Sequence, residues 1–376
     1  MRQGLVGSFG HGLVFALVAL ICAGTAAKSA ADKAAAAKAQ QEAEDAQLAA
    51  ALAANLDGTY TPPRIERDKA MPDYWEKSIA CRSPDGFAAI VLDRTGRDRS
   101  TWAALERLLQ TDPVKLRQSG ADRGGTTHDR LKLACAWRLE NPDLWKKYMG
   151  GVQEVMNDMK RIRQGGLTSA GGDPPLTCGV ADDLPGDLCG DVNEAFLMHG
   201  TNADVLINIL SKGMNMGFAG TAAGAAYGEG LYLAEDAGKN DQYTKVDPQY
   251  TGHSYICYGN MSSELHKRLY AHGVRHPGMV FYILVCRVAR GHHVRTQQMG
   301  RSATSTDTGR PVFPISFRML DMVAGVSPPT VRHHSLLADV SPPARYREFV
   351  VFQSEYIYPE YLLAYQRYEG GRGPMA

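Results

Sequence analysis

A histidine and a glycine follow three apolar residues in the stretch FLMHGTN, which begins at Phe196. A histidine can accept a hydrogen bond or transfer a proton near neutral pH, and a glycine lets a ligand approach the backbone closely. His199 and Gly200 therefore either mark the end of a strand that enters a turn or line a binding pocket. The rest of the chain must decide between these two interpretations.

The segment from Met214 to Gly230 is rich in glycine and carries no charge before Glu229. Its backbone could approach a ligand closely and move to admit it. The YGEG motif within it looks like half of a GxGxxG motif. A dinucleotide-binding glycine motif follows a strand and opens a helix, whereas this one precedes the apparent strand LYLAE. We therefore expect no Rossmann-type site here, and a bound NAD would need another architecture.

The seven cysteines form no CxxC pair, which argues against a zinc ribbon or a small disulfide-stabilised fold. One bridge, such as Cys178 to Cys189 in a stretch rich in glycine and proline, remains an alternative. Five further residues have spacings that match no metal-ligand pattern: His253, Cys257, His266, His272 and His276. We expect these to be scattered polar loop residues, and we predict no metal site.

The composition is that of a globular protein with a substantial core, because 44% of its 376 residues are hydrophobic. This length fits two domains, or one large catalytic domain with extensions. Lys and Arg number 41 against 40 Asp and Glu, so net charge gives no reason to expect a nucleic-acid partner.

The N-terminal region differs from the rest of the chain. Residues 1–27 hold the apolar run GLVFALVALICAGTAA and resemble a signal peptide or membrane anchor, with an organelle transit peptide or a wrongly assigned start codon as alternatives. Residues 28–56, dominated by Ala, Lys, Glu and Gln, predict an exposed helical spacer. Residues 57–125 are an N-terminal extension of uncertain structure. Membrane-associated or secretory localisation is expected, with the cytoplasm or nucleus as the alternative.

Local patterns predict several elements. FAAIVL reads as a strand and residues 100–109 as a helix. Asn141 and Pro142 then provide a cap and first-turn proline for an amphipathic helix, whose aromatic and methionine residues we assign to the core. From Phe196 onward, a strand to Met198 and a helix over residues 203–212 precede the strands LYLAE, MVFYILVCRVARG and REFVVFQ, and PEYLLAYQRY closes the chain. Strands separated mainly by loops indicate an α+β domain with a mostly antiparallel sheet.

Five motifs in this half occur in an order that resembles the catalytic domain of the poly(ADP-ribose) polymerase (PARP) family, with the tankyrases as near relatives. They are FLMHGTN, YGEGLYLAEDAGKNDQY, VCRVARG, HHSLL and REFVVFQSEYIYPEYLLAYQ. RLENPDLWKKY also looks like the helix that opens this domain in mono-ADP-ribosylating members. The resemblance implies a PARP-type ADP-ribosyltransferase fold over residues 126–376, with a split and mostly antiparallel sheet preceded by a helical N-terminal extension.

The resemblance also implies NAD as the co-substrate and places several residues in its binding site. His199 would hold the adenosine ribose, and the backbone of Gly200 would bind the nicotinamide carboxamide, with Thr201 beside it. Tyr232 and Tyr243 would pack on the two faces of the nicotinamide ring and orient its bond to the ribose.

Glu348, directly before FVVF, matches the catalytic glutamate of the family. A carboxylate there would stabilise the oxocarbenium character that develops as the nicotinamide leaves, and it could act as general base. The implied catalytic residues are thus Glu348, His199 and Tyr232. Asn240 stands where most relatives have a serine. Its amide could still donate to the nicotinamide oxygen, although its greater length alters the geometry.

The implied activity is transfer of ADP-ribose from NAD to protein acceptors, without a metal. The combination of His199, Tyr232 and Glu348 is that of members able to extend poly(ADP-ribose) chains. The alternatives are transfer of single units only, hydrolysis of NAD with water as acceptor, and a non-catalytic module that binds NAD or ADP-ribose.

Overall fold

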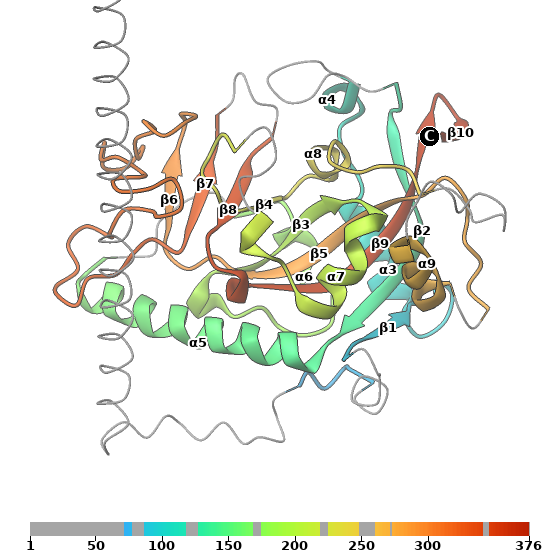
Figure 1. The fold of residues 1–376 in the computed structure, drawn as a ribbon, viewed down its shortest axis with the longest axis horizontal. Helices are drawn as coiled ribbons and strands as arrows, with labels where there is room; N and C mark the ends of the chain where they lie inside the picture. The colour runs from blue at the N-terminus through green and yellow to red at the C-terminus, as the bar shows by residue number, and fades with distance from the viewer. Residues whose placement is uncertain are drawn as a thin grey trace, which may run out of the picture. The chain divides into compact units, whose positions relative to one another are not determined.

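The computed structural model describes residues 71–76, 86–117, 127–167, 174–218, 225–247, 260–270, 273–340 and 346–375. These residues form a ten-stranded sheet in the order β1-β2-β9-β5-β3-β4-β8-β7-β6, with β10 paired to β9 (Figure 1). All pairs are antiparallel except β6 and β7, which run parallel. The strands are β1 (Ala88–Val91), β2 (Arg130–Glu140), β3 (Glu194–Thr201), β4 (Leu231–Ala234), β5 (Phe281–Ala289), β6 (His293–Thr296), β7 (Ser335–Ala338), β8 (Glu348–Val351), β9 (Ile357–Glu369) and β10 (Arg372–Met375).

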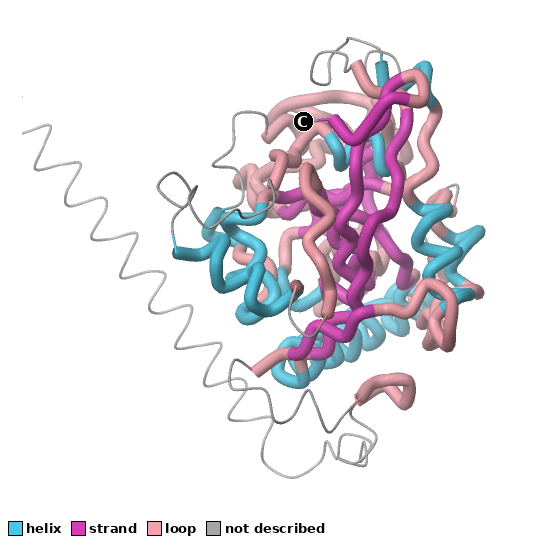
Figure 2. Tube along the Cα trace, turned by 90° about the vertical axis from the view of Figure 1, so that its right-hand side faces the viewer, coloured by secondary structure: helices cyan, strands magenta, loops and turns pink. Residues whose placement is uncertain are grey.

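Helices lie on both sides of the strands (Figure 2). The α-helices are α3 (Arg99–Leu108), α4 (Pro113–Arg117), α5 (Pro142–Gln164), α6 (Cys178–Ala181), α7 (Ala203–Lys212), α8 (Ala237–Asp241) and α9 (Asn260–Leu269), and the 3₁₀ turns are η2 (Gly190–Val192), η3 (Met216–Phe218) and η4 (Ser354–Tyr356). Alternate residues of β5 pack in opposite directions, Tyr282 and Leu284 in the same cluster as α5 and α7, and Phe281 and Ile283 in the same cluster as α3. A strand covered on both faces is nearly continuously apolar rather than alternating, and β5 is buried and apolar apart from the ion-paired Arg287.

The long helix α5 begins where its sequence predicts. The Asn141 side chain accepts a hydrogen bond from the backbone N–H of Leu144 at 3.0 Å, and Pro142 occupies the first turn. Leu144, Tyr148, Val152, Val155 and Met159 are buried in the core, and Trp145 and Met156 pack against it half-buried. The assignment of this stripe to the core is confirmed for these residues but was wrong for Met149, which is exposed.

The centre of the sheet narrows between β3 and β4. The two strands pair only at Met198 and Ala234, while β3 continues through His199, Gly200 and Thr201 in full register with β5. Beyond Met198 the edge of β3 is therefore not paired with β4. The sheet is continuous, but this single pair divides it into two halves, which corresponds to the expected split.

The predicted α+β class and mostly antiparallel sheet are confirmed. The helix over residues 203–212 has the predicted bounds as α7, and the predicted strands appear as β1, β4, β5 and β8. His199 and Gly200 lie within β3 instead of in a turn. The strand β2 and the short helix α8 were not predicted.

The N-terminal segments predicted to be extensions differ in how far the structure describes them. Residues 86–117, within the expected extension 57–125, contribute β1, α3 and α4 to the sheet and its core. Residues 1–27 and 28–56 lie outside the described residues, and with them the signal or anchor segment and the helical spacer. Among the ranges given above, no helix has the length and apolarity that crossing a membrane requires. Cys178 and Cys189 are free thiols, so the disulfide considered between them does not form.

Candidate active site

A cavity of about 610 Å³ opens where β3 and β4 diverge. Its walls come from β3, α7, β4, α8 and the first residue of β8. Every residue that the sequence placed in an NAD site lines it: His199, Gly200, Thr201, Tyr232, Asn240, Tyr243 and Glu348. The fold thus gathers segments that lie far apart in the chain into one cavity.

His199 is held in one protonation state. Its Nδ1 lies 2.9 Å from the carbonyl oxygen of Tyr232, which can only accept, so Nδ1 carries the hydrogen. Burial lowers the pKa of His199, although the bond to Tyr232 works in the opposite direction. The ring is therefore neutral at pH 7, and Nε2 has a lone pair with which it can accept a hydrogen bond from a ligand hydroxyl.

The two tyrosines are fixed to different degrees. The hydroxyl of Tyr232 donates to the carbonyl of Gly228 and accepts from the N–H of Tyr227, both at 2.8 Å. These bonds tie its ring to the glycine-rich segment before β4. Tyr243 is 46% exposed, and the ammonium of Lys239 lies 5.5 Å from the centre of its ring. An aromatic face exposed at a cavity is available to a flat ligand ring.

Glu348 is the first residue of β8 and pairs with Ala234 of β4, so its position is set at the narrow centre of the sheet. Its carboxylate is buried, and Oε1 lies 3.0 Å from Nζ of Lys239. A buried carboxylate is costly without a partner, and Lys239 supplies the opposite charge. The pair places a carboxyl group and a lysine counter-ion side by side in the wall of the cavity.

Gly200 is required by the packing of α8. A Cβ atom at this position would lie 2.0 Å from the backbone oxygen of Asn240, which is backbone that cannot move aside. The Gly200 N–H donates to Oδ1 of Asn240 at 3.1 Å, and Nδ2 of Asn240 donates to the carbonyl of Asp236 at 2.9 Å. Both ends of the Asn240 amide are thus engaged within the protein, whereas the sequence suggested that it would donate to a ligand.

Lys239 is the site residue that sequence reasoning missed. It lies next to Asn240 on α8, and the only signal for it was a lysine within the motif GKNDQY. The side of α7 that faces the cavity, with Val205, Ile209 and Lys212, was also predicted only as part of a helix. No sequence pattern joined this helix to the site, because its contribution depends on how it packs.

Comparison with known proteins identifies the family. Residues 115–367 match the sequence model of the poly(ADP-ribose) polymerase catalytic domain, so the chain belongs to this family. Over 150 residues it is 28% identical to human protein mono-ADP-ribosyltransferase PARP14, a region that covers 39% of this chain and 7% of that protein. The chain therefore spans only a small part of the length of this relative.

Proposed function

We propose that this protein is an NAD-dependent protein ADP-ribosyltransferase that cleaves the bond between nicotinamide and ribose and transfers ADP-ribose to protein acceptors. The observation that supports this most directly is the presence of Glu348 in the same cavity as His199 and Tyr232. A module that only binds NAD has no need of a buried carboxylate there.

Each group can contribute a distinct part of the reaction. The free Nε2 of His199 accepts a hydrogen bond from a ribose hydroxyl of the adenosine half, and the rings of Tyr232 and Tyr243 hold the nicotinamide. As the glycosidic bond lengthens, positive charge develops on the ribose. The carboxylate of Glu348 stabilises this charge and can accept the proton of the attacking nucleophile. The departing electron pair neutralises the pyridinium ring of nicotinamide.

Lys239 acts on Glu348 in this scheme. Its ammonium, 3.0 Å from Oε1, supplies the opposite charge to the buried glutamate and fixes its direction before substrate binds. We therefore assign Lys239 as a positioning residue for the catalytic carboxylate.

The length of the ADP-ribose product, a chain or a single unit, is a separate question. We favour competence for chain extension, because Glu348 is the residue type that extending members carry. The alternative is transfer of single units, the activity given in the name of the human relative. Incubation of the purified protein with NAD labelled in the adenylate moiety separates the outcomes: long labelled chains on protein, single labelled units, free ADP-ribose from hydrolysis, or no product.

Replacement of the catalytic carboxylate tests the assignment. We expect Glu348→Gln to lower the transfer rate by about 100-fold or more, because loss of one electrostatic stabiliser of the transition state has effects of this order. Binding of NAD, measured by calorimetry, should change by no more than a few fold. The exposed Glu355, four residues beyond the end of β8, provides the matched control Glu355→Gln, which should transfer normally. Normal chain formation by Glu348→Gln would refute the role.

A further inference from the structure

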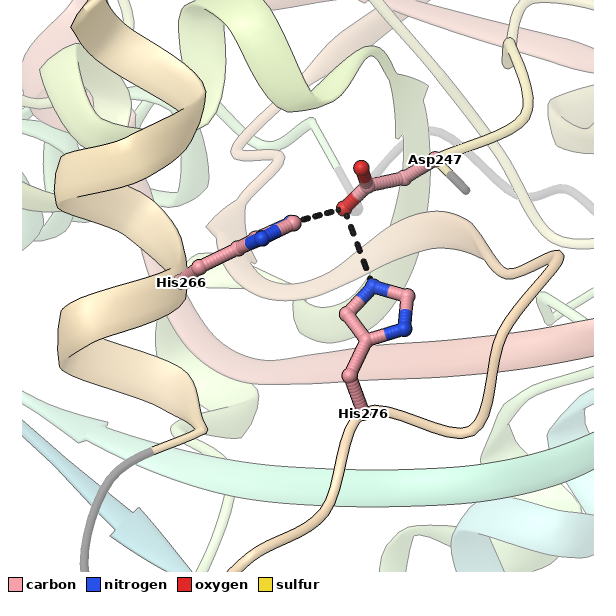
Figure 3. A group of neighbouring side chains, drawn as sticks. All are labelled: Asp247, His266 and His276. Atoms are coloured by element: carbon pink, nitrogen blue, oxygen red, sulfur yellow. Dashed lines mark hydrogen bonds and ion pairs between the residues drawn. The ribbon is translucent and has the colours of Figure 1, made fainter. Parts of the chain in front are cut away.

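Three side chains from separate segments meet outside the NAD cavity (Figure 3). Asp247 follows α8, His266 lies on α9, and His276 lies in the loop before β5. The Nε2 atoms of His266 and His276 lie 2.8 and 3.5 Å from the same carboxylate oxygen, Oδ2 of Asp247. One potential ligand atom from each residue lies within 4.8 Å of the others. The sequence predicted no such grouping, and His253, Cys257 and His272 lie outside the described residues.

The carboxylate at the centre of this cluster is firmly placed. The backbone of Asp247 forms two hydrogen bonds with Val280, of 2.7 and 3.1 Å, which tie it to the start of β5. The hydroxyl of Tyr282 donates to Oδ2 at 2.7 Å, and the hydroxyl of Tyr270 lies 2.8 Å from that of Tyr282. Hydrogen bonds of this kind orient the carboxylate ligands of protein metal sites.

We propose that Asp247, His266 and His276 bind a divalent transition-metal ion of the zinc class, with solvent in the fourth position. Two imidazoles and a carboxylate are a donor set that Zn²⁺ accepts, and a site with three protein ligands keeps one position open. Zinc bonds of about 2.0–2.2 Å place tetrahedral ligand atoms roughly 3.3–3.5 Å apart. Ligand atoms up to 4.8 Å apart must therefore approach one another by roughly 1.4 Å, while the 2.8 Å contact between His266 and Asp247 must lengthen by roughly 0.6 Å.

A hydrogen bond to His276 shows what else must change when a metal ion binds. The N–H of Gly278 donates to Nδ1 of His276 at 3.0 Å, so the neutral ring carries its hydrogen on Nε2. A metal ion on Nε2 shifts that hydrogen to Nδ1, which then needs an acceptor. Rotation of the peptide between Pro277 and Gly278 would present the Pro277 carbonyl at this place. It would give up the 3.3 Å hydrogen bond from Nε2 of Gln366, which also donates to the Gly278 carbonyl at 2.8 Å. Gly278 has φ +73°, and glycine accepts either sign of φ, so the chain permits this rotation.

Zinc titration of the full-length protein tests the site. After removal of metal with a chelator, the protein competes with a chromophoric zinc indicator. We expect the wild type to bind one more equivalent than His266→Gln or His276→Gln, whose affinity for this ion falls by about 100-fold or more. Any zinc bound by the free cysteines is the same in all variants and therefore cancels when their zinc stoichiometries are subtracted. His128→Gln is the matched control, because His128 also contacts a buried carboxylate, Asp241, at 2.8 Å and should keep the wild-type stoichiometry.

A further variant and a second measurement test the site if the histidine variants do not fold. Asp247→Asn retains both rings and nearly the same volume, and it should also lose the additional equivalent. Cobalt(II) bound to the wild type should give the intense visible absorption bands of a four-coordinate ion, and these bands should be absent from Asp247→Asn. Equal zinc stoichiometry and affinity in the wild type and all folded variants would overturn the proposal, as would a wild type without four-coordinate cobalt bands.

Discussion

The carboxamide of Asn240 already occupies the N–H that the proposed nicotinamide site needs. Because nicotinamide carries the same chemical group, it must displace the oxygen of Asn240 from Gly200. Asn240→Ser removes this competitor and supplies a short hydroxyl in its place. Since a hydrogen bond contributes about 0.5–1.5 kcal/mol, we expect the variant to bind nicotinamide or benzamide about 3- to 10-fold more tightly, as calorimetry would measure.

Two further variants make this expectation specific. Asn240→Ala frees the same N–H without adding a hydroxyl, and it should also bind benzamide more tightly than the wild type. Asn157→Ser makes the same substitution on α5, away from the cavity, and should leave the affinity unchanged. Weaker binding by both Asn240 variants would show that Asn240 assists the ligand rather than competing with it.

At the scale of elements, the short helix α8 carries much of the site, and a buried ion network holds it in place. Asp241, fully buried at the end of α8, accepts hydrogen bonds from His128 at 2.8 Å, Tyr365 at 2.6 Å and Arg367 at 2.8 Å. Burial alone would raise the pKa of Asp241, but the bond from His128 and the charge of Arg367 outweigh it and hold the pKa below its ordinary value. A helix of this length depends on such contacts, since it has few hydrogen bonds of its own.

Removal of the charge on Asp241 should therefore affect both stability and the site. We expect Asp241→Asn to cost about 3 kcal/mol of unfolding free energy, because it leaves the partly buried Arg367 without its counter-ion at a fully buried position. NAD binding should weaken as well, since Lys239 and Asn240 lie on the same helix. Denaturant unfolding and calorimetry measure the two effects. Asp183→Asn, in an exposed ion pair with Arg107, is the control and should cost less than about 1 kcal/mol. Similar losses in both variants would contradict the role of α8.

Helices and strands could be predicted from the sequence where the periodicity or the capping residues gave a strong signal. The site residues could be predicted because five motifs occur in the order typical of the family. The cap at Asn141 located α5, and the motif around His199 located the centre of the site. The strand β2 was missed because its alternating apolar and charged residues run directly into the signal for α5. Lys239 was missed because its role depends on an ion pair with Glu348, which lies far along the chain from it. Long-range pairs of this kind follow from the fold and leave no local pattern.

At the scale of the whole molecule, buried histidines link stability to acidity. Neither ring nitrogen of His293 has a hydrogen-bond partner among the described residues. Burial, together with the charge of Arg290, lowers the pKa of His293 to about 3. In the unfolded chain the pKa of His293 returns to its ordinary value near 6.5. Between about pH 3 and pH 6.5 the unfolded state therefore binds a proton that the folded state does not bind. The stabilising contribution is complete above pH 6.5 and is lost as the pH falls toward 3.

We therefore expect the unfolding free energy to decrease with acidity below pH 6.5, by up to about 1.4 kcal/mol per pH unit from His293 alone. Urea unfolding at several pH values between 4.5 and 7 measures this slope. His293→Leu, a buried residue that does not titrate, should flatten it by a corresponding amount. An unchanged slope in this variant would mean that the ring is already protonated or exposed in the folded protein.

The pairing of β1 with β2 has a practical consequence for where this protein can be shortened. The family match starts at residue 115, beyond β1 and α3. A fragment cut at that boundary would leave one side of β2 with unpaired backbone groups from Trp137 to Glu140 and would strip α3 from the core. Such bare strand edges recruit other strands, so this fragment would tend to self-associate and precipitate, whereas one that begins before residue 86 would keep β1 paired with β2 and α3 in the core.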